Sequence, residues 1–283
     1  MNQPACASAH RARVGANDAL SLPVAWAALC GLLAANMRPE GLDWLRLAAA
    51  WLVADGVLGI VWGQLATLKT LEAESAAQPA AGAERRWALP YAEPGSRGRL
   101  LGGWLARHAA HTEWANAAGF ALTASLLALV VTTFLGPAPL LVAAGALLAI
   151  GLGTLVIGDP ITLGHLGRGL QVAAGWLLVR VTAAPWQPGA WLPALCVGAW
   201  VCVDPGVQRA SRHSWRWLAR LPWAAAVALL LTQRQALAAT AVALGAFGAE
   251  LAVRPDGRAQ PVALQTAWLV STLLLALSTR YWV

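Results

Sequence analysis

Long apolar segments alternate with short polar connections along nearly the whole chain. A membrane-spanning helix needs about 20 residues to cross about 30 Å of hydrocarbon, and most of these segments approach that length. The pattern predicts an all-α polytopic membrane helix bundle of about nine transmembrane helices, at residues 20–37, 43–68, 115–135, 139–157, 168–185, 190–204, 221–233, 236–252 and 263–283.

The seventh predicted helix is short, because its apolar core is only Leu221 to Leu231. A single helix over residues 221–252 would be about 48 Å long, which exceeds the bilayer core. The polar stretch 232–235 interrupts this region. We therefore expect two short helices in a hairpin.

The chain divides into a polar N-terminal tail, residues 1–19, and one transmembrane domain, residues 20–283. The first apolar run follows a long polar stretch and precedes further spans, so we expect a retained helix rather than a cleaved signal. Two cytoplasmic loops are predicted at residues 69–114 and 205–220, the first with an interfacial helix near 97–111.

Composition and charge support this class. Apolar residues make up 58% of the chain and charged residues 12%, against about 25% charged in soluble domains. Fifteen of the basic residues fall in predicted cytoplasmic segments and four on the outer side, which places the N-terminus in the cytoplasm. The net charge of +7 is therefore a topology signal and not a nucleic-acid footprint. We expect a multi-pass protein of the bacterial inner (cytoplasmic) membrane, with membrane lipids and other integral membrane subunits as partners.

The second cytoplasmic loop carries an arginine stripe on one helical face, because its members recur at steps of three, four and four. Two tryptophans, Trp215 and Trp217, complete an amphipathic helix suited to the inner leaflet. The stripe anchors the loop to lipid or grips a diphosphate or lipid phosphate. It consists of Arg209, Arg212, Arg216 and Arg220.

Asp55 lies midway along the second predicted helix. A carboxylate at that depth costs at least about 2.5 kcal/mol. One interpretation is a proton-accepting or ligand-orienting group; the other is a packing contact, with Arg180 of the fifth helix as its partner. His165 lies among glycines in the predicted turn before the fifth helix, where an imidazole either ligates the metal of a flat tetrapyrrole or forms interfacial hydrogen bonds. No tandem metal motif is present, so no protein metal site is predicted.

Nine helices, with large basic connections after the second and the sixth, resemble the UbiA family of intramembrane prenyltransferases. The resemblance covers residues 20–283 and includes two small-residue-rich helices joined at Gly136-Pro137. It implies two carboxylate-rich motifs at the cytoplasmic ends of the second and sixth helices. Their carboxylates hold Mg²⁺, which binds the diphosphate of an isoprenoid donor.

The chain departs from both motifs. The first, Asn-Asp-x-x-Asp-x-x-x-Asp, falls on Gln64, Leu65, Leu68 and Glu72. A carboxylate repeat at the end of the sixth helix would begin at Asp204 and continue on Gln208 and Arg212. A leucine cannot donate an oxygen ligand, so one carboxylate per motif remains.

Three functional hypotheses follow. The first is a non-catalytic UbiA-like membrane protein that binds a lipid, isoprenoid, quinone or pigment, or acts as a subunit or assembly factor of a membrane complex; here Gln64, His165 and the arginine stripe are candidate ligand contacts. The second is a divergent prenyltransferase that uses Mg²⁺ with Asp204, Glu72 and Asp55. The third is a small-solute transporter with Asp55 on the path, although no inverted repeat is evident.

Overall fold

The computed structural model describes residues 22–77, 112–157, 160–187, 189, 191–202, 220–251 and 261–280. All regular structure within these residues is helical. The helices are α2 (Leu22–Ala34), α3 (Leu42–Leu52), α4 (Leu58–Ala77), α6 (Thr112–Leu135), α7 (Pro137–Val156), α8 (Pro160–Ala183), α9 (Trp191–Cys202), α11 (Leu221–Thr232), α12 (Ala236–Leu251) and α13 (Pro261–Thr279). A π-helical turn, η1 (Val53–Val57), joins α3 to α4, so these three elements form one long helix and the described residues form nine helices. The prediction that each of the nine apolar segments is helical is confirmed.

Two of the predicted breaks are confirmed, and each has a local cause. Helix α6 ends at Leu135 and α7 begins at Pro137, with Gly136 between them at φ 125°, a backbone conformation that favours glycine. Proline suits the first helical position because its missing N–H would have no partner there. The α11–α12 hairpin turns at the polar stretch, where Arg234 takes a φ of 58°.

Two helix boundaries differ from the prediction by eight or nine residues. The second helix continues past residue 68 to Ala77, because Leu, Glu and Ala in this stretch are strong helix formers even where the sequence is no longer apolar. The fifth helix begins at Pro160, eight residues earlier than expected. Glycines in its first two turns are typical of a loop. Proline at the start and small residues on a packed face are nevertheless both compatible with a helix.

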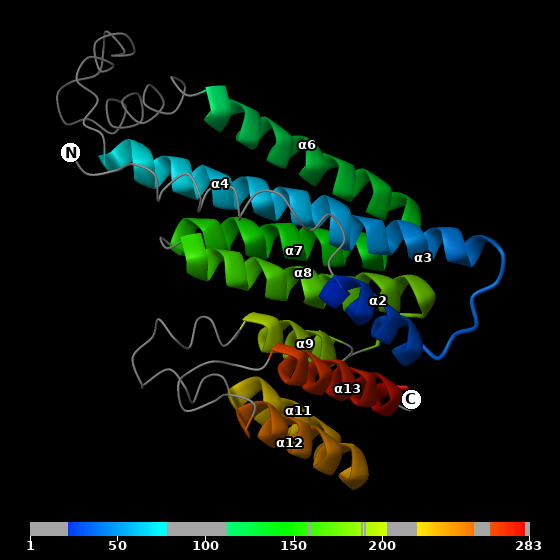
Figure 1. The fold of residues 1–283 in the computed structure, drawn as a ribbon. Coiled ribbons are helices and arrows are strands. Elements are labelled where there is room, and N and C mark those ends of the chain that lie inside the picture. The colour runs from blue at the N-terminus through cyan, green and yellow to red at the C-terminus, as the bar shows by residue number, and fades with distance from the viewer. Residues whose placement is uncertain are drawn as a thin grey trace, which may run out of the picture.

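Helix α8 lies in the middle of the fold. Figure 1 shows α6 and the α3–α4 helix on one side of it and α9, α13 and the α11–α12 hairpin on the other. Helix α8 contacts α2, the α3–η1–α4 helix, α7 and α9. It therefore connects the two halves of the protein.

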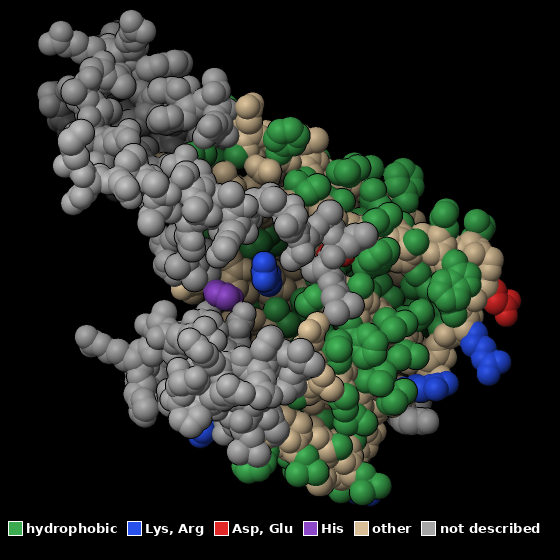
Figure 2. All heavy atoms as spheres, in the orientation of Figure 1, with side chains coloured by type: hydrophobic (Ala, Val, Ile, Leu, Met, Phe, Trp, Pro, Cys, Tyr) green, Lys and Arg blue, Asp and Glu red, His purple; other side chains and the backbone are tan. Residues whose placement is uncertain are grey.

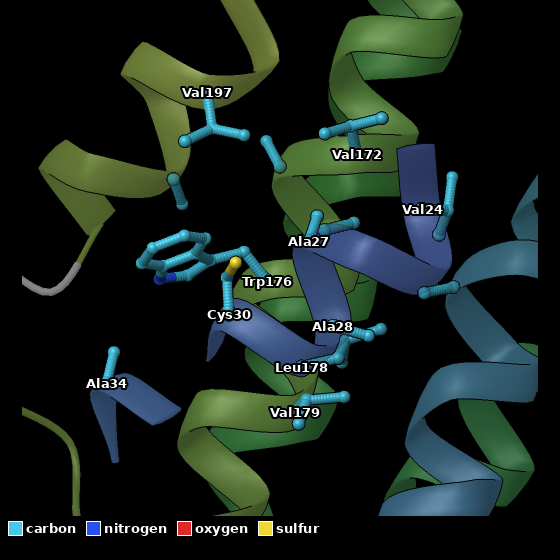
Figure 3. Close-up of a cluster of buried hydrophobic side chains, with 14 of the residues drawn as sticks. Val24, Ala27, Ala28, Cys30, Ala34, Val172, Trp176, Leu178, Val179 and Val197 are labelled. Carbon is cyan, nitrogen blue, oxygen red and sulfur yellow. The ribbon is translucent and has the colours of Figure 1, made fainter. Parts of the chain in front are cut away.

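The core around α8 is built on large and small side chains that interlock. In Figure 3, the Trp176 ring lies next to Cys30 of α2 and Val197 of α9. Trp176 is 1% exposed. A Cβ added at Gly31 of α2 would overlap the backbone carbonyl oxygen of Trp176, so the two helices approach at backbone distance.

Three helical segments are long and apolar enough to cross a membrane: Leu42–Leu71, Ala115–Leu135 and Pro137–Val156. Their outward side chains are hydrophobic. Phe134 is 80% exposed and Leu155 81% exposed, and Figure 2 shows hydrophobic side chains spread over the described surface. Such a surface suits lipid rather than water, which points to a membrane protein.

Polar contacts hold three helix ends together on one side of the fold. Arg280, at the end of α13, donates a hydrogen bond to Asn36, which follows α2. Gln235, in the α11–α12 turn, donates to the carbonyl oxygen of Ser278 at 2.8 Å. The α2–α3 connection, the α11–α12 turn and the C-terminal end of α13 therefore meet at the same end of the bundle.

We expect Gly31→Ala to lower the melting temperature of the detergent-solubilised protein, because the added methyl group must separate α2 from α8. Overpacking of this kind costs about 1–3 kcal/mol. Gly145→Ala is the matched control, since a Cβ at Gly145 has nothing within 4 Å. It should leave the melting temperature unchanged or raise it, because alanine favours a helix over glycine by up to about 1 kcal/mol. Equal melting temperatures for the two variants would contradict this account of the packing.

Candidate functional site

The π-helical turn η1 carries the most deeply buried acidic side chain among the described residues. Asp55 is 2% exposed and lies in the middle of the turn. A π-bulge interrupts the regular helical ladder, so a carbonyl group there is open to a donor from outside the helix. Such bulges occur frequently at functional sites.

That donor comes from α8. The side-chain amide of Gln171 donates to the backbone carbonyl oxygen of Asp55 at 2.8 Å and approaches its carboxylate oxygen Oδ1 at 3.4 Å. Gly59, one turn further along, makes room for this amide: a Cβ there would lie 2.8 Å from Nε2 of Gln171. The π-turn, Gly59 and Gln171 thus form one polar connection between α8 and the second helix.

The interpretation that Asp55 pairs with Arg180 is wrong. The Arg180 guanidinium, 6% exposed, donates to Oε1 of Gln187 at 2.6 Å and to the carbonyl oxygen of Pro185 at 3.5 Å. Gln171, which contacts Asp55, precedes Arg180 by nine residues on α8, and at 1.5 Å per residue this is about 13.5 Å along the helix. Arg180 therefore fixes the connection between α8 and α9, far from the π-turn.

The first carboxylate-rich motif that the UbiA resemblance implies would lie on α4, where the chain has Leu65 and Leu68 in place of two of the carboxylates. Leu65 packs against a second hydrophobic cluster, which brings together side chains of α4, α6, α7 and α8. Its buried members are Val61, Trp62, Ala124, Ile150 and Leu163. Gln64 and Leu68 on either side of Leu65 are half-buried.

The structure places His165 within α8 and not in a turn before it, which corrects the prediction. Its side chain is half-buried. Trp62 of α4 packs against Gly167 of α8, and these helices run antiparallel, because residues 55 and 62 face residues 171 and 167 in reverse order. Gln64 and His165 consequently lie at the same level of the bundle.

Several predicted site residues lie outside the part of the chain that the structure describes. These are Asp204, Arg209, Arg212 and Arg216, together with the side chain of Glu72, whose backbone belongs to α4. Among the side chains that are described, no three His, Cys, Asp or Glu residues gather in one place.

Sequence reasoning missed Gln171. Its signal was available, because a glutamine in the middle of an apolar helix needs a hydrogen-bond partner. The partner turned out to be a backbone carbonyl, which no side-chain pattern reveals.

The fold and the site together define an all-α helical protein in which three helices are long and apolar enough to cross a membrane. No family model, curated protein or solved structure matches the chain.

Gln171→Leu should destabilise the protein by about 1–3 kcal/mol, because the bulge carbonyl of Asp55 would lose its donor while remaining buried. Thermal unfolding in detergent measures the effect. Gln64→Leu is the control, since Gln64 is half-buried next to Leu65 and leucine suits that environment. If both variants melted at the wild-type temperature, the Gln171–Asp55 contact would carry no stability.

Proposed function

We propose that the protein is a UbiA-like bundle of nine transmembrane helices in the bacterial inner membrane, without metal–diphosphate chemistry. It binds a neutral lipophile or serves as a subunit or assembly factor of a membrane complex. The observation that carries this proposal is the packing of Leu65 into an apolar cluster at the position where the resemblance requires a carboxylate.

The environment of Leu65 matters as much as its identity. A lost metal ligand on a polar, hydrated surface is replaceable by water or by a neighbouring carboxylate. The neighbours of Leu65 in its cluster are hydrocarbon from α4, α6, α7 and α8. A hard cation on this face of α4 would lack oxygen ligands, and a diphosphate would lack the cation that neutralises it.

The polar contacts at one end of the fold support the nine-helix topology. The α2–α3 connection, the α11–α12 turn and the end of α13 meet there, as required if successive helices alternate in direction across one bilayer. The basic residues of this end are few, and they include Arg38, Arg46, Arg234 and Arg280. The positive-inside rule therefore supports an outer location for this end and a cytoplasmic N-terminus.

This topology predicts the compartment of each connection. Alkaline phosphatase fused after Gly136 should be active, because the α6–α7 turn lies outside, whereas the same enzyme fused after Ile157 should be inactive. Green fluorescent protein at the same two positions should give the opposite result. Equal activity of alkaline phosphatase at both positions would refute the alternation of α6, α7 and α8.

The non-catalytic proposal predicts no diphosphate release when the purified protein is incubated with Mg²⁺ and polyprenyl diphosphates of several lengths. Asp204→Asn and Glu72→Gln should leave this baseline unchanged. Mg²⁺-dependent turnover that Asp204→Asn abolishes would instead establish a divergent prenyltransferase.

The binding half of the proposal has its own readout. Mass spectrometry of an organic extract should find a lipophile retained by protein purified from native membranes, unless a partner subunit purifies with it. A protein that emerges with neither would contradict both forms of the proposed function.

A further inference from the structure

A tryptophan-lined seam lies where α9, α11, α12 and α13 pack together. Trp200 of α9 and Trp223 of α11 stack, with ring centroids 4.5 Å apart and an interplanar angle of 29°. Trp268 and Ser271 follow on α13 at a spacing of three, which places them on one helical face. We call these four side chains the tryptophan seam.

Gly245 of α12 connects the two sides of the seam. A Cβ built at Gly245 would lie 2.7 Å from Oγ of Ser271 and 3.8 Å from Cζ3 of Trp223. The serine hydroxyl and the edge of the stacked tryptophan pair are therefore close neighbours.

Three polar atoms of the seam are buried without a hydrogen-bond partner among the residues that the structure describes: Nε1 of Trp200, Nε1 of Trp268 and Oγ of Ser271. Ser271 is 1% exposed and Trp200 7% exposed. Buried polar groups in folded proteins are nearly always paired, so three orphaned atoms in one seam require an explanation.

The indole N–H of the neighbouring Trp26 does have a hydrogen-bond partner. Its Nε1 donates to the carbonyl oxygen of Leu269 on α13 at 3.2 Å. The backbone of α13 therefore does supply acceptors to tryptophan, and the seam residues do not use them.

We propose that the tryptophan seam binds a lipophile through a neutral carbonyl oxygen. An indole N–H is a donor only, so the group that the two tryptophans lack is an acceptor. The serine hydroxyl both donates and accepts, and it can donate to the same acceptor. None of the four seam side chains carries a charge, which suits a neutral oxygen and not a phosphate. The stacked rings supply a flat apolar wall for the body of the ligand. This inference rests on the proposed function and names the site and the chemical group through which the lipophile is held.

A carbonyl oxygen of this kind comes from a quinone ring or from the ester linkage of a phospholipid. The two sources are separated by reconstituting the full-length protein in nanodiscs of ester-linked or ether-linked phosphatidylcholine, because the ether lipid lacks the carbonyl group. Decylubiquinone is then titrated into the ether-lipid nanodiscs. Thermal unfolding is the readout in all arms.

If a lipid ester fills the seam, the wild type melts at a higher temperature in ester-linked than in ether-linked nanodiscs. If a quinone fills it, decylubiquinone raises the melting temperature in ether-linked nanodiscs with saturation. Trp200→Phe and Trp268→Phe keep an aromatic ring and remove the donor. In the quinone case each should raise the apparent Kd about tenfold, the change that corresponds to 1.4 kcal/mol. In the lipid case each should reduce the difference in melting temperature between the two kinds of nanodisc.

The control is Trp26→Phe, which removes an indole donor that is already satisfied. It should lower the melting temperature without ligand and leave the lipophile response unchanged. The two seam variants should lose less stability without ligand, since they lose ring volume but no hydrogen bond.

Two outcomes overturn the inference. A wild-type protein that responds to neither carbonyl source has no such ligand in the seam. Responses of equal size in the wild type and in the Trp200→Phe/Trp268→Phe double variant place the ligand elsewhere. In the second case a lipophile still binds, so the proposed function stands and the seam assignment alone is rejected.

Discussion

The close approach of the α8 backbone to its neighbours is the constraint on which the rest of the fold depends. Helices in an apolar medium gain little from hydrophobic burial, so they associate through tight packing and polar contacts. A Cβ at Gly198 of α9 would lie 2.5 Å from the carbonyl oxygen of Gly169. Gly31 and Gly167 permit the same closeness to α2 and to Trp62 of α4. Larger residues at these positions would separate α8 from three helices at once.

This packing also determines where polar groups find partners. Because α8 lies so close to the second helix, a single glutamine reaches the carbonyl oxygen of the π-turn at 2.8 Å. Arg180 is satisfied at the edge of the bundle by Gln187. Threonine and serine side chains along the helices bond to carbonyl oxygens of the preceding turn, as Thr132 does to Ala128 at 2.7 Å. Four buried polar atoms of the described residues stand out against this pattern because they have no hydrogen-bond partner: Nε1 of Trp51, Trp200 and Trp268, and Oγ of Ser271.

The sequence predicted the elements well and their contacts poorly, for physical reasons. Apolar length and polar breaks are local properties, so all nine helical segments and the turn at Gly136 could be read directly. The end of α4 and the start of α8 could not be predicted from local sequence, because polar and glycine-rich residues form a helix there when packing allows it. The prediction of an Asp55–Arg180 pair was wrong because two buried charged residues in apolar helices need not lie at the same depth. Asp55 lies well inside the second helix, whereas Arg180 is in the last turn of α8.

The face of α4 around Leu65 and the tryptophan seam differ in the ligand chemistry that each could support. A phosphorylated donor carries several negative charges and needs a cation held by oxygen ligands, whereas the face of α4 around Leu65 offers hydrocarbon. The tryptophan seam offers buried N–H and O–H donors without formal charge. Neutral donors in an apolar interior recognise a dipole such as a carbonyl group, and they do so without the desolvation penalty of burying an ion. The apolar surroundings of Leu65 and the uncharged donors of the tryptophan seam therefore both favour a neutral ligand over a phosphorylated one.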